Sequence, residues 1–347
     1  MRKLAILMAL CMVVALFVTT ANAQAPLNRM EERGSLLVWP LVDNINYLTV
    51  IEVANATSLP SLPAAVPPIQ NVTLECHVHT HGPGETGADL VKLDFNIELT
   101  PQEVFLWETY LPASAQGKTG LPNLANRKGF LFCFAIDPRF TVAPPRQEID
   151  HDFLKGDAVL FALAGARAGQ SFLYNAIPSQ ALAIAADRVL NLDGVEYTAA
   201  PTQIFFEGFA TANPAFGPLE GELVVANLGV DFLRSSQPQF DINFLCYNED
   251  EDPASLHVDY DFYEQYDMTT DLFLDFSNVQ TRKFQCSAIA SDVAGDPPAT
   301  VYRGMWAITY QYGGTYAIGE NVWQGINANA PIGAGTVVTL PLLPTGG

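Results

Sequence analysis

The sequence has few basic residues. Lys and Arg total 17 against 37 Asp and Glu, which gives a formal net charge of −20 at pH 7. A surface of this sign repels phosphate backbones and anionic lipid headgroups, so we expect no nucleic-acid partner. Divalent cations are the small partners that such a surface favours. A simpler interpretation is that the acidic excess keeps the protein soluble.

Long apolar runs are missing after residue 23. A helix that crosses a bilayer needs about 20 consecutive apolar residues, so we expect no membrane span in the rest of the chain. Signatures of common hydrolases are missing too, because there is no Gly-x-Ser-x-Gly and no His-Glu-x-x-His. Carboxylate pairs that hydrolyse glycosides follow no sequence spacing, so a carbohydrate-active enzyme stays open as an alternative.

The apolar run at the start of the chain predicts a signal peptide over residues 1–23. Arg2 and Lys3 precede the apolar segment 4–18, and Ala21-Asn-Ala23 places small residues where a signal peptidase reads. We expect cleavage after this segment and a secreted protein, periplasmic or extracellular. Since Arg2 and Lys3 are the only charged residues removed, the formal net charge would change from −20 to −22.

Cysteines are scarce, and one of the five would leave with the signal peptide. The four that remain are Cys76, Cys133, Cys246 and Cys286. An even number in an exported chain predicts two disulfides rather than a thiol nucleophile or a thiolate metal site. Three pairings are open at this point.

Helical periodicity is rare along the chain, and short apolar runs take its place. These runs are rich in Val, Ile, Phe, Tyr and Thr and are separated by Gly, Pro, Asn and Asp; examples are 35–42, 47–54, 72–80, 241–247 and 301–310. The pattern predicts an all-β fold, with the 24 prolines marking turns and strand edges. We expect antiparallel β-sandwiches, Ig-like or jelly-roll-like.

Two stretches of the chain share blocks in the same order, which predicts a duplication. Cys133-Phe-Ala-Ile136 matches Cys286-Ser-Ala-Ile289, and Val72-Thr-Leu-Glu-Cys76 matches Ile242-Asn-Phe-Leu-Cys246. Further upstream, Gly34-Ser-Leu-Leu-Val is matched with Gly221-Glu-Leu-Val-Val. We expect two tandem modules, at 27–200 and 201–347. One cysteine pair in each module gives Cys76–Cys133 and Cys246–Cys286.

Four blocks of the first half resemble those of a group of uncharacterised secreted bacterial β-rich proteins. The blocks are Gly34-Ser-Leu-Leu-Val-Trp-Pro-Leu-Val-Asp43, Cys133-Phe-Ala-Ile-Asp137, Leu154-Lys-Gly156 and Tyr174-Asn-Ala-Ile177. The resemblance covers most of the chain after the signal peptide. It implies export and a β-rich fold, and it implies no activity.

Three of the five histidines lie in His77-Val-His79-Thr-His81. In a strand, alternate imidazoles project from one face about 7 Å apart, which allows two of them to share a metal ion. His77, His79 and His81 are therefore candidate metal ligands. Further ligands would come from Glu75, Asp150, His151 or Asp152. The alternative is a polar strand face in solvent, with His81 already in the turn that follows.

Two other features suggest ligands. The acidic turn Asn248-Glu-Asp-Glu-Asp252, followed by His257, Asp259 and Asp261, is a candidate calcium loop, although it also reads as a solvated hairpin tip before Pro253.

Six tyrosines in the second half suit a carbohydrate or protein partner, or an ordinary sheet face; they are Tyr260, Tyr263, Tyr266, Tyr310, Tyr312 and Tyr316. The four tryptophans, Trp39, Trp107, Trp306 and Trp323, are expected in the core.

These observations favour a secreted structural or binding protein of the periplasm or cell surface that is not an enzyme. The partner would be a protein or a carbohydrate, and no cofactor is expected. A metal-binding protein or metal-dependent enzyme built on the histidine segment is the first alternative, with a divalent metal as its cofactor. A carbohydrate-active enzyme is the second.

Overall fold

The computed structural model describes much of the chain from residue 33 onward. The described residues are 33–57, 71–84, 91–111, 113–115, 118–136, 148–162, 168–185, 187, 189–208, 220–227, 240–248, 250–260, 263–267, 284–292, 304–313, 316–321, 323–325 and 337–339. The predicted signal peptide and Asp261 lie outside them. The described residues form antiparallel strands and no helix, which confirms the all-β prediction.

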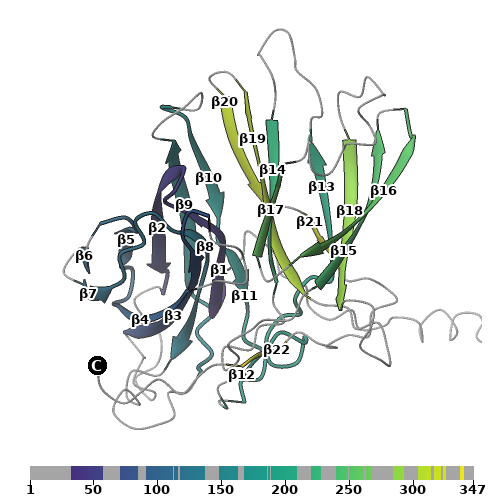
Figure 1. Ribbon diagram of the computed structural model, residues 1–347. Helices are drawn as coiled ribbons and strands as arrows, with labels where there is room; N and C mark the ends of the chain where they lie inside the picture. Colours follow the sequence, from purple (N-terminus) through teal and green to yellow (C-terminus); the bar gives the residue numbers. More distant parts are fainter. Residues whose placement is uncertain are drawn as a thin grey trace, which may run out of the picture.

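The first half of the chain forms two sheets that pack face to face (Figure 1). The five-stranded β3 sheet contains, in spatial order, β11 (Ile177–Ser179), β1 (Leu36–Asp43), β8 (Lys128–Ile136), β3 (Val72–His81) and β4 (Val91–Leu99). The four-stranded β2 sheet contains β10 (Ser171–Asn175), β9 (Leu154–Ala162), β2 (Tyr47–Asn55) and β5 (Val104–Glu108). A short hairpin of β6 (Ala113–Ala115) and β7 (Lys118–Leu121) follows β5 in the chain.

The second half also forms a five-stranded and a four-stranded sheet. The β15 sheet contains β16 (Pro253–Tyr260), β15 (Phe240–Asn248), β18 (Phe284–Asp292), β13 (Gln203–Gly208) and β21 (Trp323–Gly325). The β14 sheet contains β17 (Tyr263–Asp267), β14 (Glu220–Asn227), β19 (Met305–Gly313) and β20 (Tyr316–Asn321). In Figure 1 the β14 sheet lies between the first half and the β15 sheet.

The two halves have the same strand order. Strands β1 to β5 occupy the places in their sheets that β13 to β17 occupy in theirs, and β8 to β11 correspond in the same way to β18 to β21. The match of Gly34–Val38 with Gly221–Val225 was therefore wrong by one strand, because β1 corresponds to β13 and β14 corresponds to β2.

The pairing registers extend this correspondence to single residues. Ala54 on β2 lies opposite Lys155 on β9, and Ala226 on β14 lies opposite Trp306 on β19. Both alanines stand in the tripeptide Val-Ala-Asn, at 53–55 and at 225–227. With these tripeptides aligned, Glu52 corresponds to Val224 and Asp157 to Ile308.

The two halves share an apolar core. On the β14 sheet, side chains alternate between two clusters: Leu223, Val225, Met305 and Ala307 pack toward the β15 sheet, whereas Val224, Ala226, Trp306, Ile308 and Tyr310 join the core of the first half. Tyr310 stacks on Phe172 of β10 at a ring-centroid distance of 4.6 Å and meets the edge of Tyr47. A sheet with two buried faces needs apolar residues at successive positions, as β14 has.

One strand pair crosses the predicted module boundary between residues 200 and 201. β12 (Val189–Asn191) pairs with β22 (Val337–Thr339), so the two parts of the chain are joined by a small sheet as well as by the shared core. The boundary itself stays a prediction. Within the described ranges, no helix has the length and hydropathy needed to cross a membrane.

The structure joins the cysteines in the pairs predicted from the sequence. Cys76 is bonded to Cys133, and Cys246 to Cys286. In each pair the two residues lie directly opposite each other on neighbouring strands of one sheet, β3 with β8 and β15 with β18. Each bridge therefore fastens a central strand pair within a sheet, and neither links one sheet of a sandwich to the other.

Candidate functional site

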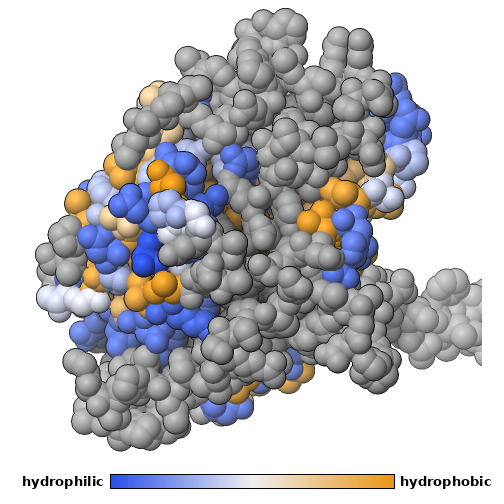
Figure 2. Space-filling model, in the orientation of Figure 1, coloured by the Kyte–Doolittle hydropathy of each residue, from blue (hydrophilic) through white to orange (hydrophobic). Residues whose placement is uncertain are grey.

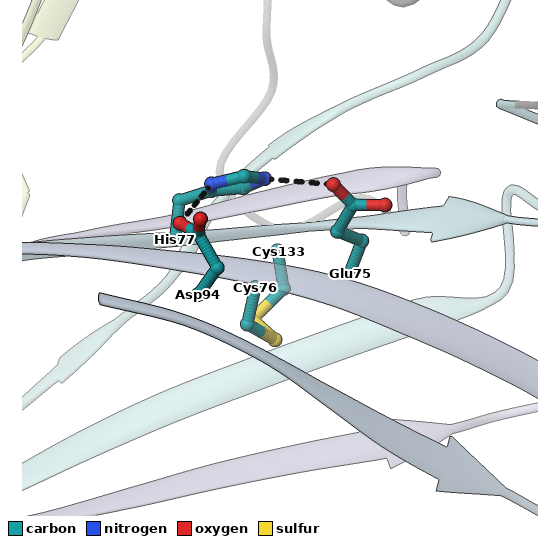
Figure 3. Close-up of a disulfide and its surroundings, with 5 residues drawn as sticks. All are labelled: Glu75, Cys76, His77, Asp94 and Cys133. Atoms are coloured by element: carbon teal, nitrogen blue, oxygen red, sulfur yellow. Dashed lines mark hydrogen bonds and ion pairs between the residues drawn. A yellow bond between two sulfur atoms is a disulfide. The ribbon is translucent and has the colours of Figure 1, made fainter. Parts of the chain in front are cut away.

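His77 is buried between two carboxylates, the buried Glu75 and the partly exposed Asp94. Its Nδ1 lies 2.7 Å from Oδ1 of Asp94 on β4, and its Nε2 lies 3.2 Å from Oε1 of Glu75 on β3. Figure 3 shows the imidazole between these carboxylates, with the Cys76–Cys133 bridge on the opposite side of the strand. The strand alternation explains this, because Cys76 faces the sandwich core while Glu75 and His77 share the other face.

That other face is buried rather than solvated. Glu75, His77 and His79 are all 0% exposed, so the expectation of a polar strand face in solvent was wrong. The His77 ring stacks on Phe132 and Phe134 of β8, at centroid distances of 5.2 and 5.8 Å. Both phenylalanine rings lie nearly parallel to the imidazole, and an aromatic ring face attracts a positively charged group.

The protonation of His77 follows from these contacts. Burial alone would lower the pKa of His77, but the hydrogen bonds to Asp94 and Glu75 and the charges of both carboxylates together raise it above the ordinary value. A protonated imidazole donates from both nitrogens, so the raised pKa fits a ring that donates to Asp94 and to Glu75 at once. In its protonated form, His77 offsets the charge of the two carboxylates beside it.

His79 and His81 differ from His77. His79 stacks on Phe130, and burial, followed by the charges of Lys92 and His77, lowers its pKa well below the ordinary value. His81 ends β3 and is partly exposed, with Nδ1 3.1 Å from the carbonyl oxygen of Gly82. His81 therefore belongs to the strand and not to the turn that follows it, which was the alternative.

The predicted metal ligands are not assembled into a metal site in the described part of the chain. Both nitrogens of His77 face carboxylates, whereas the Nε2 of His151 lies 3.1 Å from Oδ1 of Asn55 on β2. No three His, Cys, Asp or Glu side chains of the described residues lie close enough together to hold a metal ion.

The acidic turn of the second half is closed by its own asparagine. Oδ1 of Asn248 accepts hydrogen bonds from the backbone N–H groups of Asp250 and Asp252, at 2.9 and 2.8 Å, while its Nδ2 donates to Asp252. Asn248 thus performs the turn-closing role for which asparagine is favoured. The geometry matches the hairpin-tip interpretation rather than a calcium loop.

The aromatic predictions have mixed outcomes. Trp39, Trp107 and Trp306 are buried as expected, and Tyr310 is buried at the junction of the halves rather than displayed on a surface. The side chains of Trp323 and of the other five tyrosines lie outside the described residues.

The outer face of the β2 sheet is open, and sequence reasoning did not identify it. Its exposed apolar side chains include Val104 (49%), Leu106 (40%), Phe161 (44%) and Leu173 (52%). Leu173 lies opposite Val159 on β9, and Val159 lies opposite Val50 on β2, so the apolar residues form continuous rows across the strands. Apolar and hydrophilic residues are also interspersed over the first half in Figure 2. The segments 47–55 and 154–162 have apolar residues on both strand faces, so periodicity alone does not reveal this face.

Two carboxylates stand in the middle of this apolar face. Glu52 on β2 and Asp157 on β9 lie directly opposite each other. Partial burial, and then the charge of Asp157, raises the pKa of Glu52. Burial likewise raises the pKa of Asp157, against the opposing effect of Lys155. Like charges directly opposite each other destabilise a sheet, so the fold gains nothing from this pair.

The corresponding face of the second half is covered. Val224, Ala226, Trp306 and Ile308 occupy it, and they are at most 2% exposed because this face packs against the first half. The same sheet face is therefore an apolar interface in one half and an open surface in the other.

Comparisons with known proteins add little to this geometry. No protein-family model matches the chain, and no curated protein matches it. Among solved structures, the chain is similar to a Thermotoga maritima protein described as "Crystal Structure of Thermotoga maritima 1070", with 9% sequence identity over 37% of this chain and 98% of that one, at a TM-score of 0.25.

Proposed function

We propose that the chain is a secreted, non-catalytic binding protein of the periplasm or cell surface, whose binding surface is the outer face of the β2 sheet. The observation that carries the proposal is the exposure of this face, with Phe161 and Leu173 at 44% and 52%. Contiguous exposed apolar surface on a soluble protein marks interaction sites. The matched face of the second half, which is buried against the first half, is a precedent within the molecule for docking by this surface.

Export is supported by the signal-peptide pattern of residues 1–23 and by the two disulfides, which persist in oxidising compartments. The matched strand orders support a duplication of an ancestral unit, after which the two copies of this face took different roles. In the second copy the face joins the halves. In the first it is left for a partner.

The test compares two double variants of the mature protein in cross-linking experiments with material from the exported compartment. Phe161→Ser with Leu173→Ser alters the proposed surface, while Leu182→Ser with Val195→Ser removes two other exposed apolar side chains, at 41% and 66% exposure. A partner should be retained by the wild type and the second variant and lost by the first. Equal retention by both variants contradicts the proposal.

A further inference from the structure

We infer that the partner of the β2 sheet's outer face is a protein segment that presents a lysine or arginine among apolar side chains. Glu52 and Asp157 form the ion pair with this cationic side chain. This inference rests on the proposed function. It begins from the cross-strand register, which places the two carboxylates directly opposite each other. Among the described residues, neither carboxylate forms a salt bridge. The nearby cation Lys155 is two residues from Asp157 along β9, on the same face of the strand.

The matched positions of the second half show that the sheet does not need these charges. Where the first half has Glu52, Asp157 and Lys155, the second has Val224, Ile308 and Trp306. The apolar version of the face is the one that packs within the molecule. The charged version is thus unsuited to the same dry packing against a second copy of this acidic chain, because unpaired buried carboxylates are costly.

Charge complementarity then selects the occupant. The pKa values of both carboxylates are raised, which means that their ionised forms are disfavoured in the free protein. A cation within about 4–6 Å would stabilise these ionised forms. A bare divalent ion is a poor fit, since two carboxylates are few beside the six to eight oxygens that calcium takes, and the rows around them are mostly apolar. Lysine and arginine combine an apolar stem with a charged head, which suits both parts of this face.

The pairing registers place the neighbours of the two carboxylates in rows across the sheet. Asn175 on β10 lies opposite Asp157, Leu106 on β5 lies opposite Glu52, and Glu108 lies opposite Val50 on the next row. The row on one side contains Ala54 and Val104 together with Lys155, and the row on the other side contains Val50, Val159 and Leu173 together with Glu108.

The experiment measures binding of a defined peptide, in which leucine alternates with lysine, to the mature protein by titration calorimetry. Matched peptides alternate leucine with serine or with glutamate. The variant Glu52→Gln with Asp157→Asn should weaken binding of the lysine peptide at least tenfold. A control with the same change in net charge, Asp250→Asn with Glu251→Gln in the acidic turn, should leave it within about twofold. Both variants should melt no lower than the wild type, which shows that they fold.

Each other outcome overturns the inference. Equal weakening by both charge variants shows attraction to net charge alone, and equal binding of the serine peptide shows an apolar face that needs no cation. A dimer in sedimentation that Leu173→Glu dissociates assigns the face to a second copy. These results leave the binding function standing. That function fails separately if the Phe161→Ser and Leu173→Ser variant behaves like the wild type in cross-linking.

Discussion

His77 and Asp94 face each other across β3 and β4, with Nδ1 2.7 Å from Oδ1 and the histidine side chain wholly buried. A histidine whose pKa is raised by folding contributes stability that is complete below its unfolded value of about 6.5 and is lost as the pH rises through the folded value. The interior of the first half is therefore coupled to pH on the alkaline side of this range.

Asp94→Asn is expected to lower the free energy of unfolding by about 1–3 kcal/mol at pH 6, because a hydrogen bond to a charged group is lost. The difference between variant and wild type should shrink as the pH rises above about 6.5, through the raised pKa of the folded state. Urea unfolding at several pH values measures both. Glu98→Gln, which changes a charge on the same strand where the side chain is exposed, is the matched control. A pH-independent difference would contradict the assignment of charge to His77.

His151 should respond to pH in the opposite direction. Burial lowers its pKa to about 4, so the folded state holds it neutral while the unfolded chain binds a proton below about 6.5. The stability from this group is present above pH 6.5 and is lost as the pH falls toward 4. His151→Gln should reduce the change of the free energy of unfolding with pH between about 6.5 and 4, and leave it unchanged outside that window. NMR titration of the imidazole provides a direct check, and a midpoint near 6.5 in the folded protein would refute it.

The sequence predicted the all-β class from the spacing of its apolar runs, because alternation and turn residues are local properties. The disulfide pairs could be predicted for a related reason. Cys76 and Cys246 occupy matched strands, and so do Cys133 and Cys286, so the duplication assigns one pair to each half. The local matches did not fix every strand, since Gly34–Val38 was aligned with β14 rather than with β13.

The histidine segment shows what local sequence leaves undetermined. Alternation placed His77 and His79 on one face of β3, but whether that face is covered depends on parts of the chain distant in sequence. The partner Asp94 comes from another strand, 17 residues away. The open face of the β2 sheet was missed for the complementary reason. Apolar residues at both strand faces read as core, and only the assembled sheets show which face is left exposed.

Gly156, part of the Leu-Lys-Gly block, illustrates a sequence feature that the packing explains. A Cβ atom at this position would lie 2.4 Å from the Trp39 indole carbon Cζ2 and 3.0 Å from the carbonyl oxygen of Glu52. Trp39 is fully buried and donates from Nε1 to the carbonyl oxygen of Asp157, so the ring has little freedom to move. The glycine is what allows the tryptophan to lie across β9.

Gly156→Ala should therefore lower the free energy of unfolding by about 1–3 kcal/mol through overpacking. Thermal unfolding followed by tryptophan fluorescence measures the loss. Gly169→Ala is unsuitable as a control because its φ of 85° is itself strained for alanine. Gly156→Ala combined with Trp39→Phe is the better comparison, since a smaller ring should recover part of the loss. No recovery would show that the Glu52 carbonyl, rather than the indole, sets the limit.

Tyr310 is the residue through which the two halves are expected to depend on each other. Its ring stacks on Phe172, and its hydroxyl donates to the buried Glu222 carboxylate. Tyr310→Ala removes both contacts and should lower the free energy of unfolding by about 3–5 kcal/mol. Tyr310→Phe keeps the ring, so only the loss of a donor to a buried carboxylate remains, about 1–3 kcal/mol.

Because Val224, Trp306 and Ile308 join the first core on the same face, the wild type should unfold in one calorimetric transition. Tyr310→Ala should separate it into two, whereas Tyr310→Phe should not. A single transition in Tyr310→Ala would mean that the other apolar contacts of the β14 sheet couple the halves without the tyrosine.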